Sequence, residues 1–185
     1  MKKRLVILGA PGAGKGTQAR NICELLAIPT FSTGAMLRAQ MQAGTELGNK
    51  AKELIDRGEL VPDSVISALV EAELKTDRYR GGFLADGYPR NLEQARFLDQ
   101  VLKDMGTQLD AVINLDVNLE DVVGRLLKRA EIEHRSDDTE PVIRRRLQVY
   151  QEQTEPLVRY YREADLLINI CLLYTSPSPR DATLS

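Results

Sequence analysis

The sequence of 185 residues has few side chains suited to metal or redox chemistry: two cysteines, Cys23 and Cys171, and a single histidine, His134. A structural zinc site takes four Cys or His ligands, so these residues cannot build one. Isolated cysteines of this kind are typical of a protein from a reducing compartment. We therefore expect a cytoplasmic protein that holds no zinc.

Long apolar runs are also missing. No run approaches the roughly 18 apolar residues that a membrane-spanning helix requires. The chain opens with Met1-Lys2-Lys3-Arg4 and then Leu5 to Leu8, which superficially resembles a signal peptide. That apolar run is too short and leads directly into a glycine-rich segment. The sequence therefore predicts neither a membrane segment nor a targeting peptide.

The chain has no strong excess of either charge, with 25 Lys and Arg against 27 Asp and Glu. A net charge of −2 gives no general attraction to nucleic acid. Basic residues are nevertheless crowded between Arg125 and Arg162, either as solvated helix faces or as groups aimed at phosphates. The length, and a hydrophobic fraction of 43%, predict one domain with a packed core. Our default expectation is a monomer.

Short apolar segments alternate with amphipathic patterns along the chain. This alternation predicts an α/β fold with a parallel sheet covered by helices on both faces. Thr45 and Asp63 are the expected caps of two of the helices. The expected strands are 4–8, 29–32, 82–86, 111–115 and 166–170, and the expected helices are 15–27, 34–43, 46–57, 63–76, 91–105, 119–130 and 139–163.

Residues 9–17, Gly-Ala-Pro-Gly-Ala-Gly-Lys-Gly-Thr, form the most informative motif. They connect the first predicted strand to the first predicted helix, the context in which backbone amides of a glycine-rich loop surround a phosphate. Lys15 would reach the outer phosphates, and the Thr17 hydroxyl would serve Mg²⁺. Gly16 separates the lysine from the threonine, so the motif is a variant of the general pattern. A plain flexible turn would explain neither the lysine nor the spacing.

Two further motifs follow predicted strands. In Ser32-Thr33-Gly34-Ala35-Met36-Leu37-Arg38, a hydroxyl and a guanidinium one turn apart would hold a second nucleotide, although Ser32 or Thr33 would also serve as an ordinary helix cap. In Asp86-Gly87-Tyr88-Pro89-Arg90, an aspartate at the carboxyl end of a strand suits the organisation of Mg²⁺. Gln94, four residues after Arg90, can both donate to and accept from an adenine edge.

Arginines form the last group of candidates. They stay charged and make paired hydrogen bonds to phosphate oxygens, which suits the transfer of a phosphoryl group. Arg125 and Arg129 share a helix face, and Arg135 precedes Ser136-Asp137-Asp138-Thr139. Arg144, Arg145 and Arg146 lie together on the following predicted helix.

Taken together, these motifs resemble the adenylate kinases, within the nucleoside monophosphate kinases. The resemblance covers residues 1 to about 170 and depends on GAPGAGKGT, STGAMLR, DGYPRNLEQA and the stretch from RLLKR through HRSDDT to RRRLQVY. It implies a P-loop NTPase-type, doubly wound sheet of five parallel strands with two small insertions. These are an AMP-binding segment at 32–61 and a short lid, free of zinc, at 128–138. The implied reaction transfers a phosphoryl group reversibly from Mg·ATP to AMP and gives two ADP.

The resemblance also implies a role for each matching residue. Lys15, Arg90, Arg125, Arg129, Arg135, Arg146 and Asp86 would be catalytic. The ATP phosphates would be held by Gly12, Ala13, Gly14, Lys15, Gly16, Thr17, Arg125 and Arg129. AMP would be held by Thr33, Arg38, Glu59, Leu60, Val61, Gly87, Tyr88, Pro89, Arg90, Gln94, Arg135 and Arg146. Thr17 and Asp86 would serve Mg²⁺, Asp86 through water, and Asp137 and Asp138 would orient arginines.

The sequence departs from the family after Ile170. Residues 171–185 read CLLYTSPSPRDATLS, are rich in Ser, Thr and Pro, and show neither a helical nor a strand period. We interpret them as a non-native tail that resembles a translated cloning adaptor, with a disordered native tail as the alternative. Family members continue with a loop that contacts the ATP base and with a closing helix. Without them, ATP affinity and stability would both fall.

Three other functions stay open on the sequence alone. The first is a UMP or CMP kinase of the same fold, since Thr33 and Gln94 favour adenine without deciding it. The second is a guanine-nucleotide switch, for which Asn49-Lys50-Ala51-Lys52 lacks the aspartate of the usual base-reading motif. The third is a nucleotide-binding chain that has lost its catalytic activity.

Overall fold

The computed structural model describes residues 3–57, 59, 61–134 and 139–171. Its strands are β1 (Arg4–Gly9), β2 (Thr30–Ser32), β3 (Phe83–Asp86), β4 (Ala111–Asp116) and β5 (Leu167–Cys171). Its helices are α1 (Lys15–Leu26), α2 (Thr33–Ala43), α3 (Glu46–Asp56), α4 (Asp63–Leu74), α5 (Leu92–Asp104), α6 (Leu119–Ile132) and α7 (Glu140–Glu163), with a short 3₁₀ helix η1 (Asp77–Tyr79). Every predicted strand and helix is present, with ends that differ by up to two residues. Within these residues no helix is both long enough and apolar enough to cross a bilayer.

The strands form one five-stranded parallel sheet in the order β2-β3-β1-β4-β5. This confirms the predicted α/β fold class. From β1 the chain first places β2 at one edge of the sheet, then inserts β3 between β2 and β1, and finally crosses to the other side for β4 and β5. The crevice of such a sheet opens at the carboxyl ends of the strands where the order switches. The loop after β1 therefore begins at the place where a parallel α/β sheet binds its ligands.

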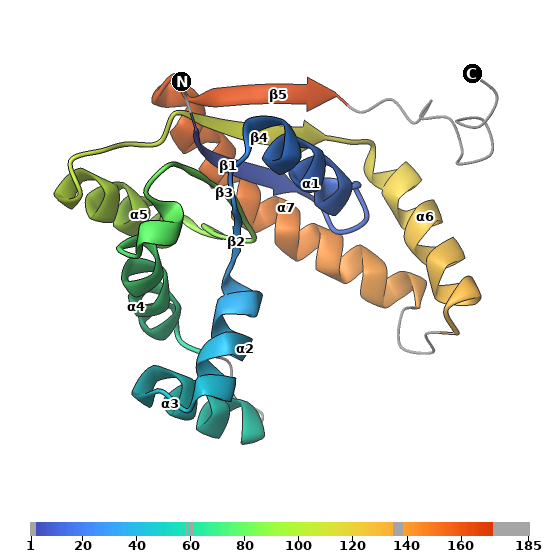
Figure 1. The fold of residues 1–185 in the computed structure, drawn as a ribbon. Coiled ribbons are helices and arrows are strands. Elements are labelled where there is room, and N and C mark those ends of the chain that lie inside the picture. The colour runs from blue at the N-terminus through green and yellow to red at the C-terminus, as the bar shows by residue number, and fades with distance from the viewer. Residues whose placement is uncertain (1–2, 58, 60, 135–138, 172–185) are drawn as a thin grey trace.

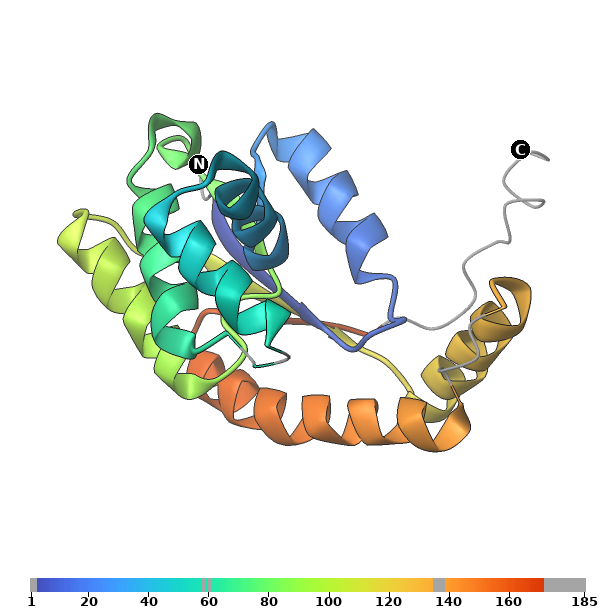
Figure 2. The ribbon, with the colours of Figure 1, turned by 90° about the horizontal axis from the view of Figure 1, so that it is seen from below.

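Helices cover both faces of the sheet, as the nearly continuous apolar strands require. On one face, α4, α5 and α7 pack on side chains such as Val6, Phe31 and Val112, which are fully buried. On the other face, α1 packs on side chains such as Ile7 and Leu84. The two layers are visible on either side of the strands in Figure 1, and α7 runs along one whole face in Figure 2.

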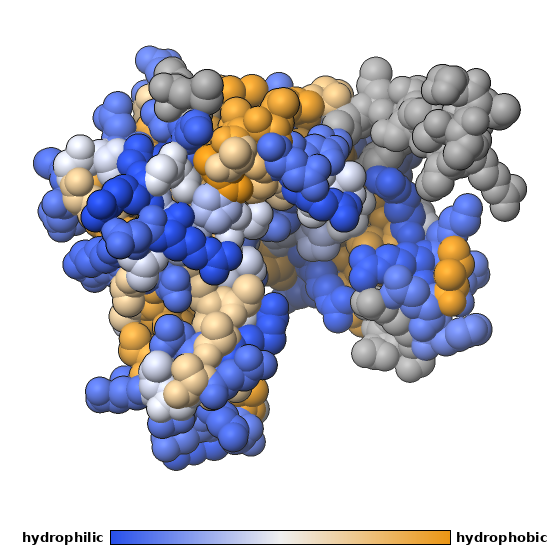
Figure 3. All heavy atoms as spheres, viewed as in Figure 1, coloured by the Kyte–Doolittle hydropathy of each residue, from blue (hydrophilic) through white to orange (hydrophobic). Residues whose placement is uncertain are grey.

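Two groups of helices project from the sheet on the side of the crevice. Helices α2 and α3 form one projection, and α6 with the start of α7 forms the other (Figure 1). The space-filling view shows a wide hollow between them (Figure 3). The described parts of the segments 32–61 and 128–138 lie in these two projections. Arg135 and the Asp137–Asp138 pair lie outside the described residues.

Local sequence explains most helix ends, with one correction. The Thr45 side chain accepts a hydrogen bond from the Gly48 amide at 3.1 Å, so the predicted cap of α3 is confirmed. The predicted cap at Asp63 is wrong, because Pro62 is the N-cap of α4 and Asp63 is its first helical residue. The Asp63 carboxylate is instead used by side chains of a different helix, as described below.

Strand β5 lies at the edge of the sheet and is poorly covered. Ile168 and Ile170 point to the same side of the strand and are 49% and 39% exposed. Apolar residues gather over this edge at the top of Figure 3. Cys171, which the sequence assigns to the tail, is the last residue of β5 and pairs in register with Asp116. The remaining residues of the tail lie outside the described part of the chain.

Candidate active site

The loop between β1 and α1 has the backbone geometry of an anion site. Gly12 and Gly14 have φ angles of 83° and 82°, a conformation that glycine adopts without strain. The Ala13 amide donates to the Ala10 carbonyl at 3.0 Å, which closes the loop. Gly14 is the N-cap of α1, so the free amides of the first helical turn face the loop together with the positive end of the helix dipole.

Lys15 forms an ion pair with Asp86, with 2.8 Å between Nζ and Oδ1. Asp86 ends β3, and its neighbour in register on β1 is Ile7. The two side chains are 28% and 25% exposed, so water and ligands can still reach them. The pair therefore holds the lysine of the loop at the carboxyl edge of the sheet. Thr17, two residues further along α1, is exposed.

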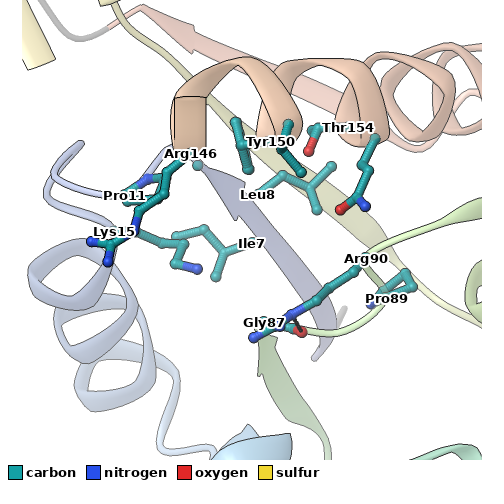
Figure 4. Close-up of a pocket in the computed structure, with 13 residues that line it drawn as sticks. Ile7, Leu8, Pro11, Lys15, Gly87, Pro89, Arg90, Arg146, Tyr150 and Thr154 are labelled. Atoms are coloured by element: carbon teal, nitrogen blue, oxygen red, sulfur yellow. Dashed lines mark hydrogen bonds between the residues drawn. The ribbon is translucent and has the colours of Figure 1, made fainter. Parts of the chain in front are cut away.

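A cavity of about 400 Å³ lies at this edge, between the loop and α7. Three cationic side chains line it, those of Lys15, Arg90 and Arg146, and its described lining contains no Asp or Glu. They come from α1, from the segment after β3 and from α7 (Figure 4). Tyr150 lies beside them, and burial raises its pKa to about 12, against the hydrogen bond with Thr154 that lowers it. The cavity thus gathers three cationic side chains, one of them paired with Asp86, and such a lining suits phosphate groups.

A second cavity, of about 290 Å³, continues toward α6. Pro11 and Arg146 line both cavities, and Arg129 lines only the second. Arg125 donates from Nη1 to the Gly12 carbonyl at 3.4 Å, so it contacts the loop itself. The two arginines of α6 are therefore placed along the glycine-rich loop.

A third cavity, of about 260 Å³, continues in the opposite direction, toward α2 and α4. Gly87 and Arg90 line both this cavity and the central one. Its other lining residues come from α2, α4, α5 and two connections: Thr33, Gly34, Leu37, Val61, Asp63, Ile66, Tyr88 and Gln94. The three cavities are neighbours and form a row, with Arg146 lining both cavities at one junction and Arg90 lining both at the other.

Gln94 is held rigidly in the wall of the third cavity. Its Oε1 accepts from the Arg90 amide at 2.8 Å, and its Nε2 donates to Asp63 Oδ1 at 2.9 Å. The Asn91 side chain caps α5, because its Oδ1 accepts a hydrogen bond from the backbone N–H of Gln94 at 2.9 Å. Tyr88 lies beneath this network, and burial, with a smaller contribution from the Asp63 charge, raises its pKa to about 12. Only 4% of the Gln94 surface is exposed.

The comparisons with known proteins decide the family. Residues 7–166 match the family model described as adenylate kinase. The chain is 53% identical over 167 residues to the adenylate kinase of Thermobifida fusca (strain YX), covering 90% of this chain and 88% of that protein. It is 51% identical over 170 residues to adenylate kinase 1 of Synechocystis sp. (strain ATCC 27184 / PCC 6803 / Kazusa), covering 92% and 89%. The chain belongs to the adenylate kinase family. The resemblance read from its motifs is confirmed.

About half of the site residues expected from the family resemblance line the three cavities: Gly12, Lys15, Thr33, Val61, Gly87, Tyr88, Pro89, Arg90, Gln94, Arg129 and Arg146. The described linings do not include six others, which belong to the loop, to α1, to the end of β3 and to α6: Ala13, Gly14, Gly16, Thr17, Asp86 and Arg125. Two more lie away from the cavities. Arg38 is exposed and lies beside Gly34, where its Nη1 is 3.4 Å from the position of a Cβ on that glycine. It is not among the described residues that line the cavity at Thr33. Glu59 is also exposed, and its amide donates to the Leu54 carbonyl at 2.9 Å. Leu60 and Arg135 lie outside the described residues.

Tyr150, Thr154 and Asp63 are among the residues that line the cavities and that sequence reasoning missed. Tyr150 and Thr154 line the central cavity from α7, one turn apart. Their helical spacing carried a signal, since they follow Arg146 at intervals of four residues and so share its helix face. Asp63 carried no such signal, because its partner Gln94 is 31 residues away along the chain.

Proposed function

We propose that the chain transfers the γ-phosphoryl group of Mg·ATP reversibly to AMP and gives two ADP. The observation that carries this proposal is the row of three cavities, with cations at both junctions and the glycine-rich loop at one end. Two nucleotides placed end to end would put their phosphates in the central cavity, among Lys15, Arg90 and Arg146. A site for one nucleotide would not need the third cavity.

Phosphoryl transfer requires the protein mainly to position the two nucleotides and to stabilise the charge of the transferred group. An oxygen of the AMP phosphate attacks the γ-phosphorus in line, and ADP leaves from the other side. Lys15, Arg90 and Arg146 would stabilise the negative charge that spreads over the transferred group. No general base is needed, because the attacking phosphate oxygen is already anionic. Tyr150, with a pKa of about 12, would stay protonated and act at most as a hydrogen-bond donor.

The residues present fit a magnesium ion carried with ATP. Mg²⁺ prefers hard oxygen ligands and keeps several of its waters. The Thr17 hydroxyl and the Asp86 carboxylate, the latter through water, are the groups that would hold it. When bound, the ion would offset the charge of the ATP phosphates. Lys15 would then turn from Asp86 toward those phosphates.

The two flanking cavities would take the two nucleotides. On the ATP side, the backbone from Gly12 to Thr17 would surround the phosphates, with Arg125 and Arg129 beside them. On the AMP side, Thr33, Val61 and the turn from Gly87 to Arg90 would enclose the base and sugar, with Gln94 on the base edge. Leu60 and Arg135 complete the proposed AMP contacts. Arg38 and Glu59, which are exposed outside the third cavity, would reach AMP only when the projections close.

Closure is the proposed role of the two projections. We assign 32–61 as the AMP-binding segment and 128–138 as the lid. The hollow between them in Figure 3 is open to solvent, and water would compete with AMP for the phosphoryl group. Segment 128–138 holds one histidine and no cysteine, which supports a lid without zinc. We also propose a monomer, because one chain builds all three cavities, and a cytoplasmic location, which the free cysteines Cys23 and Cys171 support.

Replacing Lys15 with methionine tests the proposed function. ADP formation from ATP and AMP should fall about 10²-fold or more, since one cation at the transferred group is lost. Thermal unfolding should show that the Lys15→Met variant remains folded. Lys103→Met, which removes an exposed lysine of α5 far from the cavities, should keep full activity. A Lys15→Met enzyme as active as the parent would contradict the assignment.

A ligand titration separates the remaining alternatives. Diadenosine pentaphosphate spans two nucleotide sites, so it should bind the parent chain and block ADP formation. Turnover should be highest with AMP and much lower with CMP and UMP. A chain that binds AMP alone but neither the dinucleotide nor ATP would be a nucleotide binder that has lost its catalytic activity.

A further inference from the structure

The Asp63 carboxylate joins the beginnings of two helices. Its Oδ2 accepts from Asn91 Nδ2 at 2.9 Å, and its Oδ1 accepts from Gln94 Nε2 at 2.9 Å. Asp63 is the first residue of α4, while Asn91 and Gln94 stand at the N-cap and in the first turn of α5. Both carboxylate oxygens are thus used to hold amide groups of a different element.

These contacts fix which way the Gln94 amide points. A carboxylate can only accept and a backbone N–H can only donate, so Nε2 must face Asp63 and Oε1 must face Arg90. A flipped amide would place oxygen against carboxylate and NH₂ against N–H, which leaves both pairs unsatisfied. The orientation of this buried amide is therefore set by the chemistry of its two partners.

Part of the amide remains available to a ligand. An amide has two oxygen lone pairs and two N–H hydrogens, and the described contacts use one of each. Gln94 lines the cavity that Thr33 and Val61 also line, so the remaining lone pair and N–H are the groups that it can offer to a base bound there. A base bound there meets an acceptor at Oε1 and a donor at Nε2, in a fixed arrangement.

That arrangement matches one class of purine. The edge of a 6-aminopurine offers an N6 donor beside an N1 acceptor, whereas a 6-oxopurine offers an O6 acceptor beside an N1–H donor. An amide that cannot flip satisfies the first and opposes the second. A site built to make such hydrogen bonds rejects a mismatched base strongly, because buried polar groups are then left unpaired.

We propose that Asp63 is a positioning residue that determines nucleobase specificity: it holds the Gln94 amide in the orientation that accepts AMP and rejects IMP. This inference rests on the proposed placement of AMP in the third cavity. In this proposal Asp63 has no role at the reacting phosphates and acts on the base by orienting Gln94.

Asp63→Asn is the sharpest test, because the new side chain has nearly the same shape. Asparagine has one acceptor oxygen for two amide donors, so Gln94 or Asn91 must lose its partner. Steady-state rates would be measured with AMP and with IMP as acceptors, each with saturating ATP. We expect the ratio of kcat/KM for AMP over IMP to fall at least tenfold. The KM for AMP should rise, while the KM for ATP stays within about twofold.

Glu93→Gln is the matched control. It removes an exposed carboxylate from the same first turn of α5, next to Gln94. Its AMP/IMP ratio should equal that of the parent. Should Asp63→Asn fail to fold, Asp63→Ser carries the same test, since serine is well tolerated at a helix N-terminus.

The outcomes separate this inference from the proposed function. A folded Asp63 variant with the parental AMP/IMP ratio would overturn the inference while the kinase function stands. An equal loss in Glu93→Gln would also overturn it, because charge alone would then explain the effect. A parent chain that makes no ADP from ATP and AMP would overturn both.

Discussion

Glycine residues of one chain serve different purposes, and Gly48 shows the most demanding one. It lies in α3, where that helix returns against the end of α2. A Cβ on Gly48 would overlap the Gln40 carbonyl and lie 2.7 Å from the Met41 nitrogen, both of which are backbone atoms. Backbone cannot move aside as a flexible side chain can. The absence of a side chain is thus what allows α2 and α3 to pack into one projection.

Gly48→Ala should lower the free energy of unfolding by about 1–3 kcal/mol, the usual range for overpacking. Urea unfolding of the purified variant measures this. Gly124→Ala is the control, because Gly124 is an exposed helical position and a Cβ added there would meet no other atom within 4 Å. That change should be neutral or stabilise by up to about 1 kcal/mol. Equal effects at both positions would show that close packing at Gly48 is unimportant.

Two of the three consecutive arginines on α7, Arg144 and Arg146, make contacts of different kinds. Arg146 lines two cavities of the site. Arg144, two residues earlier, faces another direction, because residues two apart on a helix do not share a face. Its Nη1 and Nη2 donate to the two oxygens of Glu120 at 2.8 and 3.0 Å, and its Nε donates to Glu140 at 3.1 Å. Composition alone could not tell these roles apart.

At the scale of elements, the pair between Arg144 and Glu120 joins α7 to α6 across the base of the second projection. The paired hydrogen bonds from Arg144 hold the pKa of Glu120 below its ordinary value of 4.5. A lowered carboxyl pKa adds stability at neutral pH, which is lost as the pH falls through that lowered value. Both side chains are well exposed, so solvent screens the pair and its effect on stability is small.

Arg144→Ala should therefore change the pKa of Glu120 clearly and the free energy of unfolding only slightly. The pKa of Glu120, followed by NMR of its side-chain carboxyl carbon, should rise toward 4.5. Arg145→Ala removes the neighbouring exposed arginine and should leave the pKa of Glu120 unchanged. A Glu120 pKa that is the same in the Arg144 variant and in the parent would show that the two helices are not joined in solution by this pair.

The elements themselves were predictable because local patterns specify them. Buried strands appear in the sequence as short apolar runs, and amphipathic helices appear through their helical period, so every described strand and α-helix was predicted. The short 3₁₀ helix η1, which has neither pattern, was not predicted. The phosphate loop was found for the same reason, since its glycines and lysine are contiguous. Asp63 was wrongly predicted as an N-cap, because aspartate is a common N-cap residue and that preference alone accounted for its position before a predicted helix. Its hydrogen bonds to Asn91 and Gln94 depend on how α4 packs against α5, which no local pattern reveals.

At the scale of the whole molecule, the site is a property of the sheet order. The phosphate loop, Asp86 and the arginines of α6 and α7 are far apart along the chain. They meet because β1 lies between β3 and β4 and because α7 returns across the sheet. The resemblance to the family supplied the residues of the site. The arrangement of its three cavities in a row could be seen only once the sheet and both projections were in place.

A second long-range contact ties α5 to α7 on the covered face of the sheet. Tyr160 donates to Asp99 Oδ2 at 2.5 Å. Burial raises the pKa of Asp99 above its ordinary 3.8, although the hydrogen bond from Tyr160 opposes the rise. The same bond is the main reason why the pKa of Tyr160 rises to about 12. A raised carboxyl pKa means that the folded state binds the proton more tightly than the unfolded state does.

Because the pKa of Asp99 is raised in the folded state, the free energy of unfolding depends on pH. The stability that Asp99 contributes is fully present below pH 3.8 and is lost as the pH rises through its higher folded-state pKa. Asp99→Asn removes this titration but keeps an acceptor for Tyr160. The free energy of unfolding of the variant, relative to the parent, should therefore increase from pH 3 to pH 7, as urea titrations across that range would measure.

Two further measurements make this prediction specific. In Asp99→Asn the pKa of Tyr160, followed by NMR of its ring carbon, should fall from about 12 toward 10, because the carboxylate that held its proton is gone. Asp104→Asn removes an exposed carboxylate at the end of the same helix and should leave the pKa of Tyr160 unchanged. A stability difference that stays constant with pH would mean that Asp99 is hydrated in solution, and that α5 and α7 pack less tightly there than their contacts indicate.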